Sequence, residues 1–215
     1  MQHFPTIDKL HTDVLEEKYG KISSRVLKHN REIREALLVD PKGISRTYAL
    51  TFIGSNKDKE IEKINRRIKN GGAIGKEFRK SGYSIRKNVL DVFKIKIPQW
   101  LKKEFRINQN YAKSRLSEFY AKKLGKNPII YGIVTEVYSP DFRKPVINRT
   151  DKSQIGAITK FLEKIGFTKE EIWRRLGDEN NYEDVIKRFE KAKRLSKKEI
   201  SQLRNKIITE IESPR

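Results

Sequence analysis

The chain has 215 residues, and its 49 Lys and Arg outnumber its 28 Asp and Glu to give a formal net charge of +21. It has no cysteine and no apolar run near the roughly 20 residues of a membrane-spanning helix, which excludes disulfides, thiol nucleophiles and cysteine-ligated metals and leaves no candidate membrane span. The first residues lack the basic-then-apolar layout of a signal peptide, so we expect a cytoplasmic protein.

The N-terminal segment is expected to form a helix and then a short strand. Apolar residues recur at helical spacing over residues 7–19, where Thr6 can cap the helix and Gly20 ends it. Residues 21–28 favour a short strand.

A β-hairpin is expected next. Residues 31–40 and 45–53 are two apolar runs on either side of a Pro-Lys-Gly turn, a pattern typical of antiparallel strands. In the first strand, Arg34 shares a face with Ala36 and Leu38. By itself this places Arg34 either on the surface at a strand end or in a buried anion-binding position, and the surface position is the simpler interpretation.

Two helices follow the hairpin. Residues 58–69 have a helical stripe of isoleucines, and residues 73–78, which come after two glycines, can begin a shorter helix. Backbone amides near Ile74 and Gly75, at the start of this helix, are candidates for binding an anion. A helix end followed by a turn explains the glycines more simply, because the order of residues is not that of a phosphate loop.

The remaining strands complete the first domain. Residues 89–97 alternate between apolar and polar side chains, and Pro98 separates them from a short helix over 99–105. Residues 111–122 and 129–138 predict a second hairpin around a Gly- and Pro-containing turn. Hairpins with helices between them indicate an α+β domain with a largely antiparallel sheet and flanking helices.

The C-terminal part of the chain has a different composition. We expect domain 1 to cover residues 1–150 and an all-α extension to cover residues 151–215, with helices over 153–165, 168–176, 182–195 and 196–212. Ser196 and Glu199 match a capping box at the start of the last helix. The extension can pack on the first domain, form a homodimer face or bind nucleic acid, and packing is the interpretation we favour.

The positive charge is concentrated in the first domain. Residues 1–150 hold 33 Lys and Arg against 16 Asp and Glu, whereas residues 151–215 hold 16 against 12. The basic residues are spread along the domain rather than gathered in one block. This pattern is typical of a well-solvated surface, and it is also compatible with nucleic acid or with a small anionic ligand.

One charged residue, Glu136, interrupts the apolar strand over residues 129–138. An ionised carboxylate is costly to bury without a partner, so Glu136 either reaches water at the strand end or lies in a pocket with a raised pKa. The three histidines all lie in the first 30 residues and lack metal-site spacing, so we expect no metal.

Three segments carry a resemblance to a known family. They are REALL at 34–38 followed by TYALTFI, then AIGKEFRKSGYSIRK, then GKNPIIYGIVTEVYSP, in that order. In this order residues 7–140 resemble the chorismate pyruvate-lyase-like family, which shares its fold with the UTRA-type effector domains of bacterial transcription regulators.

The resemblance implies a lyase that removes pyruvate from chorismate to leave 4-hydroxybenzoate, without metal or cofactor. It implies that Arg34 holds a substrate carboxylate, that Glu136 is the acid/base group, and that the amides of Ile74 and Gly75 bind the other carboxylate. It also implies that Arg115 matches the arginine that members of this family carry on the strand over residues 111–122 and that it contacts the substrate. We further expect Arg34 and Glu136 to pair in the empty site, and Glu136→Ala to abolish turnover with the fold intact.

Two other functions stay open at this point. One is a UTRA-like sensor that binds a small anion without turnover, and the other is a basic protein that binds nucleic acid. A sensor of this kind is expected to follow a winged-helix domain, and none precedes residue 7, which favours the enzyme.

Overall fold

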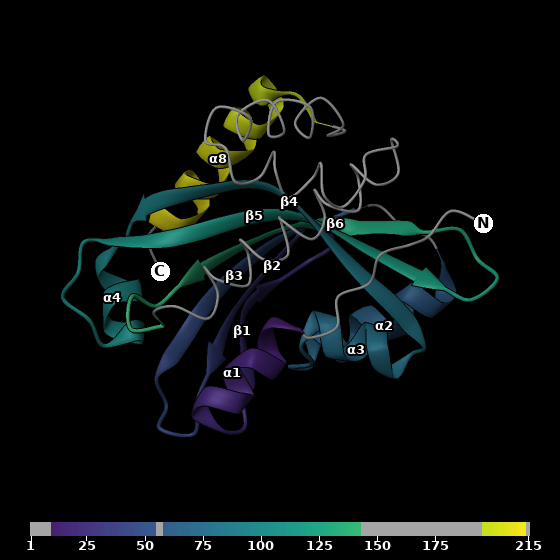
Figure 1. Ribbon diagram of the computed structural model, residues 1–215, viewed down its shortest axis with the longest axis horizontal. Coiled ribbons are helices and arrows are strands. Elements are labelled where there is room, and N and C mark those ends of the chain that lie inside the picture. The colour runs from purple at the N-terminus through teal and green to yellow at the C-terminus, as the bar shows by residue number, and fades with distance from the viewer. Residues whose placement is uncertain (1–9, 55–57, 143–194, 214–215) are drawn as a thin grey trace, which may run out of the picture. The chain divides into compact units, whose positions relative to one another are not determined.

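The computed structural model describes residues 10–54, 58–142 and 195–213. Its centre is a six-stranded antiparallel sheet with the order β1-β2-β3-β6-β5-β4 (Figure 1). The strands are β1 (Ser23–His29), β2 (Ile33–Val39), β3 (Ser45–Ile53), β4 (Tyr83–Lys96), β5 (Tyr111–Lys123) and β6 (Ile129–Tyr138). The predicted α+β class, with an antiparallel sheet and flanking helices, is confirmed.

Three helices cover one face of this sheet, which we call the α1–α3 face (Figure 1). They are α1 (His11–Tyr19), α2 (Lys59–Lys69) and α3 (Ile74–Lys80). The predicted isoleucine stripe of α2 is fully buried, and Phe78 of α3 joins it above β4, β5 and β6. Asp58 caps α2 by accepting a hydrogen bond from the Glu60 amide, which fixes where that helix begins.

The opposite face is covered by α4 (Gln99–Phe105) and by the C-terminal part of α8 (Lys197–Glu212). Trp100 of α4 lies edge-on to Tyr48 of β3 and donates its indole N–H to the carbonyl of Ile211, at 3.0 Å. Arg204 of α8 bonds Asp91 of β4. Helices on both faces bury the sheet, so side chains on either face can lie away from water.

Both predicted hairpins are present, with the β2–β3 and β5–β6 pairs antiparallel. The prediction for β4 is wrong in two respects. The strand begins six residues earlier than expected, at Tyr83, and its pairing with β5 shifts register between Val89 and Asp91. The bulge at this shift moves Val89 to the face opposite Asp91, so the expected single alternation from Val89 onwards does not hold.

The chain divides into two compact units, one of Met1–Phe142 with Gln202–Arg215 and the other of Arg143–Ser201. The expected boundary at residue 150 and the helices expected over 153–165, 168–176 and 182–195 lie outside the described residues. The capping box at the start of α8 is confirmed, because Ser196 and Glu199 exchange side-chain and backbone hydrogen bonds. No helix in the described parts of the chain is long and apolar enough to cross a membrane.

Candidate functional site

Two neighbouring rows of side chains cross the centre of the α1–α3 face. The strand register aligns Arg34, Thr51, Val134 and Ser117 in one row, on β2, β3, β6 and β5. Two residues further along the same strands, it aligns Ala36, Ala49, Glu136 and Arg115. Neighbouring strands lie about 4.8 Å apart. The two rows therefore bring Arg34, Glu136 and Arg115 onto one face, from strands far apart in the sequence.

Glu136 is 5% exposed and lies among three hydrogen-bond donors. Its Oε1 accepts from Lys87 Nζ at 2.5 Å, and its Oε2 accepts from Arg115 at 2.5 Å and from the Tyr138 hydroxyl at 2.9 Å. Burial opposes ionisation of Glu136, but the nearby positive charges of Lys87 and Arg115 hold its pKa well below the usual range. Glu136 is thus a buried carboxylate, and the expectation of a raised pKa is wrong.

Arg34 is 2% exposed and has only neutral partners. Its guanidinium donates to Ser24 Oγ at 2.8 Å and to the carbonyl of Gly72 at 3.1 Å. Within the described residues it contacts no carboxylate, and burial lowers its pKa from 12.5 to about 10. The expected pairing of Arg34 with Glu136 is therefore not formed, because Glu136 is bound by cations from β4 and β5.

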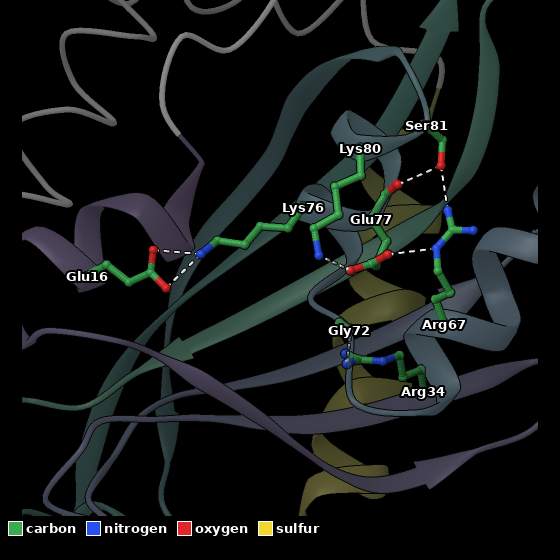
Figure 2. A network of polar contacts seen from close by, with 8 residues as sticks. All are labelled: Glu16, Arg34, Arg67, Gly72, Lys76, Glu77, Lys80 and Ser81. Carbon is green, nitrogen blue, oxygen red and sulfur yellow. Dashed lines mark hydrogen bonds and ion pairs between the residues drawn. The ribbon is translucent and has the colours of Figure 1, made fainter.

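Neighbouring cations differ from Arg34 in this respect (Figure 2). Lys76 bonds Glu16 at 2.6 Å, Arg67 bonds Glu77 at 2.8 Å, and Lys80 bonds the other oxygen of Glu77 at 3.0 Å. Arg34 instead points to the backbone of Gly72. A buried guanidinium without a counter-charge costs free energy in the empty state, and an anion placed beside it offsets that cost.

The sheet between Arg34 and Glu136 is lined by small side chains with unsatisfied polar atoms. Ala36 and Ala49 occupy the row of Glu136, and Ala49 is partly accessible to solvent although it lies on a central strand. Thr51 Oγ1 and Ser117 Oγ are buried and make no hydrogen bond within the described residues. The floor of the site thus holds buried polar atoms whose hydrogen-bonding capacity is unused within the described residues.

Helix α1 covers the Glu136 end of the site. The ring of His11 lies edge-on to Tyr138 at 5.3 Å and to Phe142 at 5.7 Å, and its Nε2 lies 2.7 Å from Thr47 Oγ1. Burial, together with the charges of Lys87 and Arg115, lowers the pKa of His11 from 6.5 to about 4. His11 is therefore neutral at pH 7.

The other residues of the predicted site have distinct positions. Arg115 of β5 lies directly opposite Glu136 of β6 and forms an ion pair with it. Ile74 and Gly75 begin α3, just beyond Gly72. A Cβ at Gly75 would come within 2.8 Å of Leu10 Cδ2, so the glycine lets the Leu10 side chain pack closely against the start of α3. A role of the Ile74 and Gly75 amides in anion binding stays a prediction.

Sequence reasoning missed Lys87 and His11. Lys87 looks like one surface lysine among many, and its contact with Glu136 depends on how β4 pairs with β5. The sequence pattern places His11 on the first helix but assigns no function to it. The sequence signal that it offered was its position beside the apolar stripe of that helix.

No known protein family matches this chain, and no curated protein matches it. Arg34, Lys87, Arg115 and Glu136 together carry three positive charges against one negative charge.

Proposed function

We propose that this chain binds chorismate on the α1–α3 face and eliminates pyruvate from it, leaving 4-hydroxybenzoate, without metal or cofactor. The observation that carries the proposal is Arg34, a buried guanidinium that lacks a carboxylate partner within the described residues. Such a group is suited to bind a substrate carboxylate with paired N–H donors.

The charge balance of the site supports a dicarboxylate as ligand. Chorismate has one carboxylate on its ring and another on its enolpyruvyl group. The three cations exceed the one carboxylate by two charges, which is the charge that chorismate brings. In the proposed binding mode the ring carboxylate lies at Arg34, the ring lies over Ala49, and the enolpyruvyl carboxylate lies toward Arg115.

In the proposed reaction Glu136 is the base. The elimination breaks the ether bond at ring C3 and removes the hydrogen on C4, which makes the ring aromatic. A carboxylate held ionised beside Lys87 and Arg115 can accept that hydrogen as a proton. Because no electrons are transferred to another molecule, the reaction needs no redox partner.

A second candidate function is a sensor that binds the same anion without turnover. The low pKa of Glu136 and its three donors favour this candidate, since all of them stabilise the carboxylate that would have to accept a proton. The two candidates share the ligand site and differ in whether the ether bond breaks.

Turnover is tested by incubating the full chain with chorismate and measuring 4-hydroxybenzoate and pyruvate, in single-turnover as well as catalytic amounts. Glu136→Gln should lower kcat by about 10²- to 10⁴-fold, the usual contribution of a general base. Arg34→Gln should raise KM by roughly 10- to 100-fold, because a hydrogen bond to a charged group is lost.

Matched controls are available on the exposed face of α2, where Glu62→Gln and Arg66→Gln make the same chemical changes. Both controls should behave like the unmodified chain. Saturable binding of 4-hydroxybenzoate without product formation would favour the sensor. Absence of both turnover and binding would overturn the proposed function.

A further inference from the structure

Lys87 is the one member of the cluster that comes from the edge strand β4, and it bonds a different carboxylate oxygen from the other donors. Its side chain is 14% exposed, and its Nζ reaches Oε1 of Glu136, whereas Arg115 and Tyr138 share Oε2. Lys87 can therefore leave Oε1 for a substrate atom while Oε2 keeps both of its donors.

The proposed elimination needs a proton donor as well as a base. When the C3–O bond breaks, the departing enolpyruvyl oxygen takes the bonding electron pair and must be protonated to leave as the enol. Glu136 is ionised in the resting site and cannot supply that proton. The reaction releases no net proton. A donor that regains its proton from the base would therefore return the site to its starting state.

We infer that Lys87 is that donor: its ammonium group protonates the leaving enolpyruvyl oxygen while Glu136 accepts the proton from ring C4. This inference rests on the proposed lyase function. The enol that leaves then becomes pyruvate by tautomerisation. Neutral Lys87 and protonated Glu136 remain, and the proton returns from Oε1 to Nζ along their hydrogen bond, which restores the starting site without a proton from solvent.

The other titratable groups that face Lys87 are poorly suited to this role. The pKa of Arg115 is raised by its interactions with Tyr138 and Glu136, so it keeps its proton. Burial raises the pKa of Tyr138 well above 10. His11 on α1 has a pKa of about 4 and carries no transferable charge at pH 7. For Lys87, burial and the nearby Arg115 lower the pKa by more than the contact with Glu136 raises it, which makes its ammonium a better acid.

The experiment compares Lys87→Arg and Lys87→Met with the unmodified chain, using chorismate turnover and, separately, equilibrium binding of 4-hydroxybenzoate. Arg keeps the positive charge but does not give up its proton. We expect Lys87→Arg to bind 4-hydroxybenzoate within about threefold of the unmodified chain and to lose 10²- to 10⁴-fold in kcat. We also expect the alkaline limb of the pH–kcat profile to disappear in the residual activity. Lys94→Arg, at an exposed position further along the same strand, is the matched control.

The outcomes separate the donor role from the lyase function. Turnover in the unmodified chain that survives in Lys87→Arg would overturn the donor role and leave the lyase standing. No turnover in the unmodified chain would overturn both. A loss of kcat in Lys87→Met that a small primary amine in solution restores would support the donor role directly, because the amine replaces the missing acid.

Discussion

At the scale of single residues, the buried charges of Lys87, Arg115 and Glu136 depend on one another for their stability. Lys87 and Arg115 lie on neighbouring strands with most of their side chains removed from water, and Glu136 is the carboxylate that both contact. Burying either cation without it would leave an uncompensated charge in a region of low dielectric. The residue proposed to do chemistry therefore also holds the local structure together.

We predict from this that Glu136→Ala destabilises the fold by about 3–5 kcal/mol, the usual cost of removing one partner of a buried ion pair. This reverses the sequence-based expectation that the substitution leaves the fold intact. Urea unfolding followed by far-UV circular dichroism measures the change. Glu62→Ala on the exposed side of α2 should stay within about 0.5 kcal/mol of the unmodified chain.

The double variant Glu136→Ala with Lys87→Met sharpens this test. Removing one of the two cations should recover part of the lost stability, because only Arg115 is then left without a carboxylate in the cluster. If the double variant is instead as unstable as the sum of the two single changes, the three charges do not act as a unit.

At the scale of secondary-structure elements, local patterns predicted most of the fold. The β2–β3 hairpin follows from two apolar runs around one turn, and the end of α1 follows from Gly20. The turn residues and Gly20 each lie within a few residues of the hairpin or helix end that they predict. The bulge in β4 is different, because it depends on how β4 pairs with a strand some 25 residues away, and no local pattern marks it.

The same distinction applies to the candidate site. Arg34 and Glu136 stand out because each is a charge within an apolar strand, so the sequence could identify them singly. The sequence could not show that Arg34 lacks a carboxylate or that Lys87 reaches Glu136. Both facts depend on the order β2-β3-β6-β5-β4, in which strands distant in sequence become neighbours.

Helix α1 supplies a prediction at this scale, because His11 attaches it to β3. The pKa of His11 falls from 6.5 to about 4 on folding, so the native state binds fewer protons than the unfolded state between these values. Stability should be complete above pH 6.5 and fall as the pH drops toward 4, by at most roughly 3 kcal/mol. Chemical unfolding at pH 4.5, 5.5 and 6.5 measures this slope.

His11→Gln should flatten the slope, since the titrating group is gone. His29→Gln is the matched control. Burial also lowers the pKa of His29, but this residue lies on the edge strand β1, and its substitution should leave most of the slope in place. If the free energy of unfolding of His11→Gln depends on pH as strongly as that of the unmodified chain, another group titrates. The contact of His11 with β3 would then not be the cause of the pH dependence.

At the scale of the whole molecule, residues from the end of the chain complete a core formed near its beginning. Ile207 and Ile211 of α8 are fully buried, and the Ile211 carbonyl accepts the indole N–H of Trp100. Lys206 of the same helix lies over the ring of Phe52, 4.8 Å from its centre. Contacts between such distant segments are usually made late in folding, because the loop between them must first be closed.

We therefore predict that Ile207→Ala lowers the free energy of unfolding by about 2–5 kcal/mol, the usual cost of truncating a buried isoleucine. Ile208→Ala, one position along the same helix and only partly buried, should cost clearly less.

Unfolding is followed by tryptophan fluorescence and by far-UV circular dichroism, in a Trp173→Phe background so that Trp100 is the only tryptophan. If α8 belongs to the core of the sheet, both signals should change in one shared transition at a lower denaturant concentration. An early fluorescence transition with the circular dichroism of the sheet retained would instead show that α8 detaches on its own, and that the sheet keeps its fold without it.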